Sequence, residues 1–523
     1  MPDRVTPSGV VETASGGCDV HMVQPVQLGP KPLTREDVQA VARHDVPVEI
    51  PEATRELVAS ARAHIERLAT AEEPTYGVST GFGALAVRHI PPDRRTALQR
   101  SLIRSHAAGA GPEVEREVVR ALQLLRLRTL STGHTGVRPT TVEAMAAMLN
   151  AGITPVVHEY GSLGCSGDLA PLSAAALALM GEGMVRDASG ELVEAGVALR
   201  GAGIEPVVLA EKEGLALING TDGMLGMLVL AISDLHALLD LADLTAAMSV
   251  EALLGTDRVF AADLHALRPH PGQSASAARI AALLDGSEIM ESHRGPDCTR
   301  VQDAYSLRCS PQVHGAARDT VAYAEVVADR ELASVIDNPV VLADGRVESN
   351  GNFHGAPIAY VLDFLAIPVA DVASIAERRT DRMLDVNRSH GLPPSLADDP
   401  GVDSGHMIAQ YTQAAIVSEL KRLAVPASVD SIPSSAMQED HVSMGWAAAR
   451  KLRKAVDGLT TVLAIELLTA ARALDLRAPL KPAPATAAAV AKLRETVQGP
   501  GPDRHLAPEI AAAEALIRSG ALR

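Results

Sequence analysis

The sequence predicts a mostly α-helical protein, in which a bundle of long central helices follows a loop-rich N-terminal part. Strand patterns are sparse, with one at 46–50 and one at 340–349, where Asp344-Gly345 indicates a short hairpin. Apolar residues make up 47% of the chain but aromatic residues only 2%, so we expect an aliphatic, alanine-rich core that suits close helix packing. Apolar residues with a period of 3.6 and few helix breakers fill five long segments, at 212–255, 310–335, 356–387, 404–424 and 438–475.

Shorter elements are expected before the bundle. Residues 1–28 are rich in Gly, Ser, Thr and Pro without periodicity, which indicates a flexible leader. The first helix should begin after Thr34, whose side chain would cap it together with Asp37. Two glycine-rich stretches, 75–85 and 159–171, interrupt the helical pattern. Further helical segments lie at 52–70, 93–109, 113–130 and 173–183.

The chain of 523 residues is expected to fold as one unit with a recognisable order of parts. After the leader, residues 29–210 should form the loop-rich N-terminal domain and residues 211–480 the central bundle. Residues 481–523 should hold two last short helices, separated by a proline-bearing stretch near 481–490. A chain of this length buries roughly three quarters of its unfolded surface, so it needs no disulfide or metal to fold.

The charge balance excludes several classes of partner. Lys and Arg number 47 and Asp and Glu 64, so the net charge is 47 − 64 = −17. A nucleic acid or an anionic membrane requires a basic face, so we expect neither as a partner. The most apolar stretch, 223–244, is interrupted by polar residues, which is typical of a buried helix in a soluble protein; they are Asp234, His236, Asp240 and Asp243. Because the N-terminus has no apolar core of signal-peptide length, we expect a cytoplasmic protein.

The cysteines and histidines predict no metal site. The four cysteines, Cys18, Cys165, Cys298 and Cys309, are too few and too scattered for a disulfide framework. No CxxC pair occurs, and the histidines show no ligand spacing. We therefore expect neither a metal nor a dissociable cofactor.

One motif at 77–81 fits a serine hydrolase by pattern only. Gly77-Val78-Ser79-Thr80-Gly81 matches the G-x-S-x-G nucleophile elbow, which requires a buried strand before it and a helix after it. The preceding residues do not form a buried strand pattern, and the chain lacks the α/β alternation of that fold. The context therefore disfavours a serine hydrolase.

The glycine-rich segment 161–171 carries a more specific chemistry. One interpretation is structural, with Ser166 or Asp168 capping a helix that begins near Leu169. The other is chemical, because in Xaa-Ser-Gly the amide nitrogen of the glycine can attack the carbonyl two residues back when the backbone bends tightly. Only glycine permits that bend at low cost. Loss of water closes the ring across Cys165, Ser166 and Gly167, and loss of the serine hydroxyl leaves a 4-methylidene-imidazol-5-one (MIO), a strong electrophile.

This segment and several others together resemble the aromatic amino-acid ammonia-lyase family. The resemblance covers most of the chain after residue 70, and its motifs follow one another in the family's order. They are Tyr76-Gly77 with Thr80-Gly81-Phe82-Gly83, Ser105-His106-Ala107, Cys165-Ser166-Gly167, 212–217 with Asn219-Gly220-Thr221, 302–309, Asp337-Asn338-Pro339, Gly351-Asn352-Phe353-His354, and 428–433 with 438–444.

The resemblance implies the helical fold of the ammonia-lyase and fumarase–aspartase-like superfamily. It also implies an MIO-dependent carbon–nitrogen lyase of the bacterial type, which converts L-histidine to trans-urocanate and ammonia in the first step of histidine degradation. Its members are homotetramers whose active sites are shared between subunits. Two positions depart from the usual pattern: Cys165 stands where the family usually has Ala, and Met437 where Asn is more common. The Cys165 side chain stays outside the ring chemistry, so cyclisation should survive.

The resemblance also assigns roles at the reacting end of the substrate. Tyr76 would be the base that removes the β-proton, which requires a lowered pKa; loop packing is the alternative. Arg308 would bind the substrate carboxylate as a bidentate fork, unless it is a surface residue at a helix end. Tyr305, three residues earlier, would lie on the same helical face beside the ring or the substrate. Asn219 and Gln302 would donate to the ring oxygen and the carboxylate, although Asn219-Gly220 is also typical of a left-handed turn.

Three further residues concern the side-chain end of the substrate. A carboxylate at Glu439 would hydrogen-bond an imidazole, whereas against a phenyl ring it would be an unpaired charge that costs several kcal/mol. His106 and Glu439 together therefore favour histidine as the substrate, although His106 is also a plausible helix C-terminal residue. Phe353 would wall the ring pocket, or belong to the core.

Two other functions remain open at this stage. One is a tyrosine or phenylalanine ammonia-lyase or an aminomutase of the same family. The other lies outside the enzyme class, and is a catalytically silent helical scaffold that has kept the fold.

Overall fold

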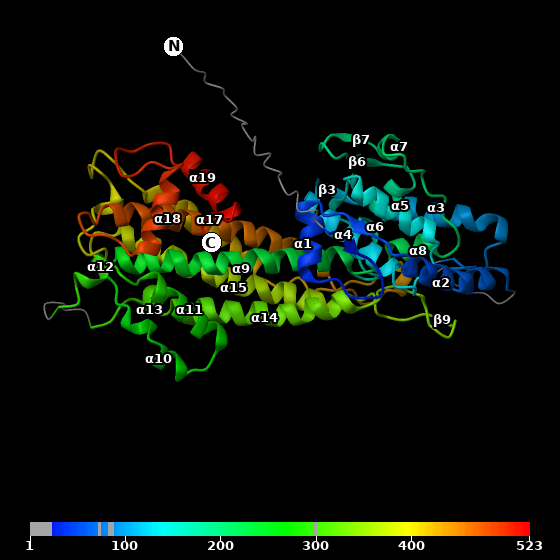
Figure 1. The fold of residues 1–523 in the computed structure, drawn as a ribbon, viewed down its shortest axis with the longest axis horizontal. Helices are drawn as coiled ribbons and strands as arrows, with labels where there is room; N and C mark the ends of the chain where they lie inside the picture. Colours follow the sequence, from blue (N-terminus) through cyan, green and yellow to red (C-terminus); the bar gives the residue numbers. More distant parts are fainter. Residues whose placement is uncertain (1–23, 72–74, 82–87, 296–300, 523) are drawn as a thin grey trace, which may run out of the picture.

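The computed structural model describes residues 24–71, 75–81, 88–295 and 301–522, so most of the expected leader lies outside the described residues. In Figure 1 the molecule is elongated along a bundle of long helices, with smaller elements gathered at its two ends. The bundle consists of α9 (Asp222–Ala252), α14 (Ser310–Ala333), α15 (Ala356–Leu384), α16 (Met407–Leu423) and α17 (Gly445–Asp475). Within it, α17 packs against α9, α15 and α16, and α14 against α9 and α15.

The N-terminal elements surround one end of the bundle (Figure 1). Thr34 and Asp37 form the expected capping box at the start of the first helix. The helices are α1 (Arg35–His44), α2 (Glu52–Thr70), η2 (Pro92–Arg94), α3 (Arg95–His106), α4 (Arg116–Leu130), α5 (Pro139–Asn150), α6 (Leu169–Leu179), α7 (Ala195–Gly201) and α8 (Glu213–Ile218).

The strands are short and lie at the edges of the helical core. β1 (Val26–Gln27) pairs in parallel with β2 (Val48–Glu49). Of the two, β2 lies inside 46–50, where a strand was predicted. The expected hairpin is confirmed by the antiparallel pair β8 (Val340–Val341) and β9 (Val347–Glu348). The others are the antiparallel pair β3 (Ala110–Glu113) and β5 (His158–Tyr160), and the sheet of β4 (Thr154–Pro155), β6 (Met184–Arg186) and β7 (Leu192–Glu194).

The far end of the bundle carries the remaining short elements (Figure 1). They are η3 (Arg258–Phe260), α10 (Ala262–Ala266), α11 (Pro271–Leu283), α12 (Glu288–Glu291), α13 (Tyr305–Arg308), η4 (Pro394–Leu396), α18 (Pro484–Arg494) and α19 (Ala507–Arg518). The short η5 (Ser435–Met437) lies on the segment between α16 and α17. One main buried cluster of mostly aliphatic side chains extends from Val26 to Ala513, so the N-terminal part and the bundle share a core.

Three expectations about helix boundaries are wrong. The segment 212–255 is broken at 219–221, where Arg126 Nη1 donates to the carbonyls of Ala216 and Asn219, which would otherwise accept helical hydrogen bonds. The last bundle helix begins at Gly445 rather than at 438, since Met444 has a left-handed φ of 52°. The stretch 481–490 does not separate the last two helices, because α18 begins within it at Pro484, where the missing N–H costs nothing.

Two helices, α9 and α15, are long and apolar enough to cross a membrane by length and composition. In the folded chain 72% and 61% of their most apolar windows are buried, as in core helices of soluble proteins. On α9 the expected interruption of the apolar pattern is present, with Asp243 fully buried against His314 and Arg318 of α14.

Candidate active site

The glycine-rich segment 161–168 meets the break between α8 and α9. Gly167 has φ +81°, and a Cβ at this position would lie 2.0 Å from the carbonyl oxygen of Gly220. The two glycines form an isolated parallel bridge, in which the amide of Asp168 donates to Gly220 O at 2.7 Å. The backbone here therefore requires glycine at 167 for two reasons, its dihedral angle and its contact distance.

Asp168 caps α9 and not α6. Its fully buried carboxylate accepts from the amides of Gly223 at 2.9 Å and Met224 at 3.0 Å, and from Ser162 Oγ at 2.9 Å. At α6, which begins at Leu169 as expected, Asp168 is the N-cap residue by position only, because its side chain makes no cap bond to that helix. Burial raises the pKa of Asp168 to about 7, although the amides at the helix start favour its charged form.

Asn219 lies in the break itself, beneath the glycine-rich segment. It is 2% exposed, and its Nδ2 donates to Asn338 O at 2.9 Å. Among the described residues its Oδ1 is buried without a hydrogen-bond partner, which leaves one polar atom of the amide to be satisfied by a ligand or water. Its φ of −103° is not left-handed, so the turn interpretation of Asn219 is wrong.

Two buried ion pairs support this break. Arg126 pairs with Asp222 and donates through Nη1 to the carbonyls of Ala216 at 3.0 Å and Asn219 at 3.1 Å. Lys212 Nζ lies 2.6 Å from Asp337 Oδ2, and both side chains are fully buried. Two carbonyls at the end of α8, those of Ala216 and Asn219, are thereby satisfied by Arg126.

The segment before α17 runs along the other side of the glycine-rich segment. Met444 N donates to Leu163 O at 2.9 Å, and Ser443 Oγ donates to Gly164 O at 3.0 Å. Burial first, and then the nearby Glu439 carboxylate, raise the pKa of the Cys165 thiol to about 12. The structure thus brings Glu439 beside the Cys165–Gly167 triplet.

Glu439 is half-buried and held in place by Ser434. The Ser434 hydroxyl donates to Glu439 Oε2 at 2.9 Å, and the two residues form an antiparallel bridge. Met437, the unusual residue of this segment, is 70% exposed in the single chain. The carboxylate is therefore oriented within the chain, with part of its surface left for a ligand.

Tyr76, Phe353 and His106 also belong to this end of the molecule. Tyr76 is half-buried, packs against the main core and precedes Gly77, which contacts Lys212, Leu215 and Pro339. Phe353 is half-buried two residues before Gly355, which packs against Met224 and Ser443.

His106 ends α3, and its ring Nδ1 lies 2.9 Å from Leu102 O within the same helix. In the single chain this is the helix C-terminal arrangement that the sequence offered as the alternative for His106.

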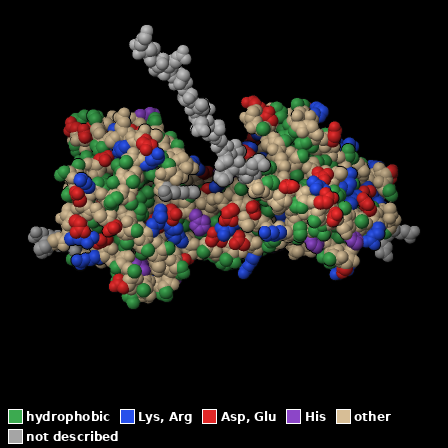
Figure 2. Space-filling view, viewed as in Figure 1, with side chains coloured by type: hydrophobic (Ala, Val, Ile, Leu, Met, Phe, Trp, Pro, Cys, Tyr) green, Lys and Arg blue, Asp and Glu red, His purple; other side chains and the backbone are tan. Residues whose placement is uncertain are grey.

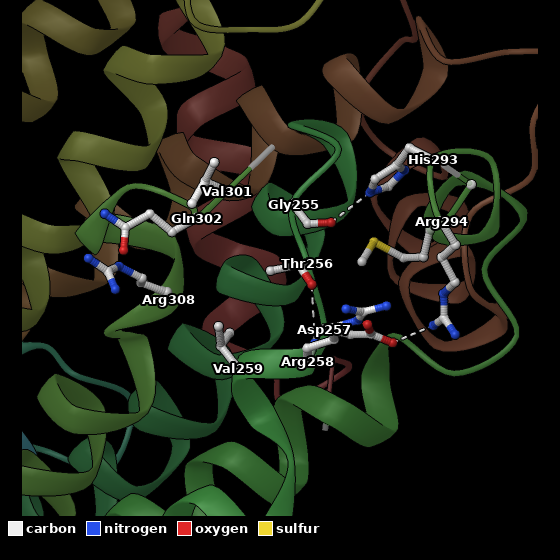
Figure 3. A pocket seen from close by; sticks show the side chains of 12 residues that line it. Gly255, Thr256, Asp257, Arg258, Val259, His293, Arg294, Val301, Gln302 and Arg308 are labelled. Atoms are coloured by element: carbon white, nitrogen blue, oxygen red, sulfur yellow. Dashed lines mark hydrogen bonds and ion pairs between the residues drawn. The ribbon is translucent and has the colours of Figure 1, made fainter. Parts of the chain in front are cut away.

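Gln302, Tyr305 and Arg308 lie at the opposite end of the bundle. Gln302 and Arg308 line a pocket of about 400 Å³ together with residues 255–259 and 293–295 (Figure 3). The Arg308 guanidinium lies 4.7 Å from the centroid of the Tyr305 ring, as expected for residues on one helical face. Arg308 Nε is buried and has no hydrogen-bond partner among the described residues, while Tyr305 is 71% exposed. The three form a second group, on and beside α13.

The length of helix α9 gives the separation between the Cys165–Gly167 triplet and the group on and beside α13. Its first turn is capped by Asp168, and the residues that follow its last turn, Gly255 and Thr256, line the Arg308 pocket. Its 31 residues span about 45 Å at 1.5 Å per residue. One chain therefore does not bring Arg308 to the Cys165–Gly167 triplet.

Comparisons with known proteins agree with these motifs. The family model for aromatic amino acid lyases matches residues 33–495. The chain belongs to the aromatic amino acid lyase family. A histidine ammonia-lyase of Streptomyces avermitilis is 66% identical over 498 residues, which cover 95% of this chain and 97% of that protein. A histidine ammonia-lyase of Sorangium cellulosum is 50% identical over 501 residues, covering 94% and 97%.

Solved structures match the lyase fold over the same span. A tyrosine aminomutase from Streptomyces globisporus has a TM-score of 0.89 at 37% identity, covering 95% of this chain and 98% of its own. A histidine ammonia-lyase from Trypanosoma cruzi has a TM-score of 0.87 at 38% identity, covering 95% and 94%. The mostly α fold predicted from the sequence is thereby confirmed.

Sequence reasoning did not find several residues on which the site of this lyase depends. Lys212 and Asp337 were noticed only as parts of motifs, and Asp168 only as a local cap. Their roles depend on contacts between residues far apart in the chain. The only signal in the sequence was a polar residue in otherwise apolar or glycine-rich surroundings.

Within the described part of the chain, no group of three His, Cys, Asp or Glu side chains could hold a metal ion.

The raised pKa of Asp168 predicts a pH-dependent stability. Between about pH 4 and pH 7 the folded chain keeps a proton on Asp168 that the unfolded chain has lost, so the free energy of unfolding should fall as the pH rises through this range. Denaturant unfolding at pH 5 and pH 8 measures how far the free energy of unfolding falls between the two pH values. In Asp168→Asn this fall should be smaller by roughly 2–4 kcal/mol. The same pH dependence in both proteins would contradict a titrating Asp168.

Proposed function

We propose that this lyase is a histidine ammonia-lyase, which eliminates ammonia from L-histidine to give trans-urocanate in the first step of histidine degradation. The position of Glu439 beside the Cys165–Gly167 triplet carries this choice of substrate. The 66% identity to the Streptomyces avermitilis enzyme over nearly the whole chain supports it.

The Glu439 carboxylate distinguishes an imidazole from a phenyl ring. A carboxylate held by Ser434 can accept a hydrogen bond from an imidazole N–H and stabilise its cation. Against a phenyl ring the same carboxylate would lose its hydration without gaining a partner, at a cost of several kcal/mol. His106 would contribute a second polar contact at this end, and Phe353 would form the wall of the ring pocket.

We further propose that Cys165, Ser166 and Gly167 cyclise to MIO. The fit rests on Gly167, because its positive φ and its approach to Gly220 leave no room for a Cβ and hold the backbone bent. The unpartnered Oδ1 of Asn219 is an acceptor available to an N–H of the substrate. When present, the group supplies an electrophile for the amine of the substrate.

We propose that side chains of the protein remove the β-proton and bind the substrate carboxylate. Tyr76 is proposed to remove the β-proton, and its position before Gly77, which packs against the Lys212 side chain, places it beside the break between α8 and α9. Arg308 is proposed to bind the substrate carboxylate through its fork, with Gln302 as a neutral donor and Tyr305 beside the substrate.

These roles require more than one copy of the chain. Because α9 holds the triplet and Arg308 about 45 Å apart, a complete site needs Arg308 from another subunit. The helices α14, α15 and α16 expose large apolar side chains that a partner would cover: Tyr323, Tyr360, Phe364, Ile367, Ile408 and Tyr411. We propose the homotetramer with shared sites that the family resemblance implies.

The proposed setting is the cytoplasm, with a small amino acid as the only non-self partner. The face in Figure 2 shows acidic and basic side chains intermixed, without a broad basic patch. Together with the net charge of −17, this disfavours nucleic acids and anionic membranes as partners.

Loss of the carboxylate at Glu439 should impair the histidine reaction. Glu439→Gln keeps the shape of the side chain but removes its charge, so kcat/KM for L-histidine should fall about 10- to 100-fold. Urocanate absorbance measures it, with the exposed Glu191→Gln as a control that should match the unaltered enzyme. If the unaltered protein formed a phenylpropenoate from L-Tyr or L-Phe and no urocanate, the histidine assignment would be wrong.

The active-site peptide should lack two molecules of water in the unaltered protein. In Gly167→Ala the added Cβ collides with Gly220, so the peptide should keep its full mass and turnover should cease. Intact-mass and peptide-mass measurements report the ring independently of activity. Gly201→Ala, at a position with open space, is the control and should show the same dehydrated peptide as the unaltered protein. A full-mass peptide in the unaltered protein would contradict cyclisation.

Shared sites predict complementation between inactive variants. Ser166→Ala lacks the electrophile and Arg308→Ala lacks the carboxylate fork, yet mixed oligomers contain some sites with both residues intact. Co-expression should therefore restore activity in about a quarter of the sites if mixing is random. Ser166→Ala with Gly167→Ala is the control, because both changes lie in the same loop and should restore nothing. If the first pair were equally inactive, the shared site would be excluded.

A further inference from the structure

A buried ion pair in the middle of the bundle has no part in the chemistry described so far. Arg379 of α15 and Glu466 of α17 are both fully buried, with Nε–Oε1 at 2.5 Å and Nη2–Oε2 at 3.0 Å. Such pairs lose hydration on burial and are often no more stabilising than well-packed apolar residues. The contacts made by the rest of each side chain therefore indicate what the pair does.

The carboxylate side of the pair is satisfied within the bundle. Glu466 accepts hydrogen bonds from Thr245 Oγ1 at 2.7 Å and Ser249 Oγ at 2.9 Å, both on α9. Three long helices thus fix the carboxylate, and the carboxylate in turn fixes two of the three guanidinium nitrogens of Arg379.

The third nitrogen of Arg379 reaches out of the bundle to α13. Its Nη1 donates to Ser306 O at 3.4 Å and to Ser310 Oγ at 3.2 Å. The Ser310 hydroxyl donates in turn to Ser306 O at 3.1 Å, so both serines belong to one network. Ser306 lies between Tyr305 and Arg308 on α13, and Ser310 begins α14.

Helix α13 cannot fix its own orientation. It has four residues, too few for a helix to be stable alone. On its other side Asp303 accepts from Thr256 N at 2.7 Å, which ties the approach to α13 to the end of α9. The Arg308 guanidinium contacts the Tyr305 ring of the same short helix, and its Nε has no partner among the described residues. Its direction therefore depends on how the α13 backbone is held.

We propose that Arg379 is a positioning residue for substrate binding: anchored by Glu466, it holds the α13 backbone through Ser306 and Ser310 and so sets the direction of Arg308. This rests on the proposed function, in which Arg308 binds the substrate carboxylate. A planar guanidinium with two nitrogens fixed leaves the third in one orientation, which an apolar pair of equal volume could not provide.

Two serine variants separate positioning from stability. Ser310→Ala removes the hydroxyl between Arg379 and α13, and Ser249→Ala removes a hydroxyl that bonds the same ion pair on the side away from α13. Both delete one buried oxygen, so thermal unfolding should shift by similar amounts. Only Ser310→Ala should raise KM for L-histidine, by about 3- to 10-fold with kcat little changed, because binding of the carboxylate is weakened in the ground and transition states alike. Equal KM values in the two folded variants would overturn the proposal.

A double variant tests whether the effect passes through Arg308. In Arg308→Lys, which lacks the fork, adding Ser310→Ala should leave KM unchanged, whereas independent effects would multiply. Multiplying effects would overturn the positioning role while leaving the proposed function intact. If Arg308→Lys alone had the KM of the unaltered enzyme, the proposed role of Arg308 would fail, and the positioning role with it.

Discussion

The contact between the Asp168 carboxylate and the first turn of α9 is the constraint on which the site depends. It joins the glycine-rich segment to α9, one of the two longest bundle helices, and uses amides that a helix start leaves unpaired. The same junction contains the approach of Gly167 to Gly220, which leaves no space for a side chain on Gly167, while Arg126 and Asp222 leave none on Gly220. The bent backbone at which cyclisation is proposed is therefore held by a rigid element rather than by a loop alone.

From this junction the bundle extends in one direction, and the second group of functional residues lies at its other end. With the proposed site residues, the length of α9 would be a structural reason for self-association, because the two groups of those residues lie at opposite ends of a single chain. Buried polar networks inside the bundle then serve a second purpose beside packing. The network of Arg379 and Glu466 links the central helices to the short helix that carries Tyr305 and Arg308.

Local patterns in the sequence predicted the elements well, and long-range contacts explain what they missed. The Thr34 cap and the 340–349 hairpin depend on neighbouring residues, and both are present. The break at Asn219 was missed because the apolar period continues across it, while its cause is Arg126, some ninety positions earlier. Motif recognition supplied the candidate site residues, but motifs do not give the distances in space between residues of different motifs. The separation of Arg308 from Cys165 became visible only in three dimensions.

The burial of Cys165 has a consequence for the durability of the protein. Thiols react with oxidants and alkylating agents as thiolates, and a thiol whose pKa is raised to about 12 is almost entirely protonated near neutral pH. With 8% of its surface exposed and a carboxylate beside it, Cys165 should behave as a small inert side chain, much like the alanine usual at this position. A cysteine at this position should therefore add little sensitivity to oxidation, even beside the proposed electrophile.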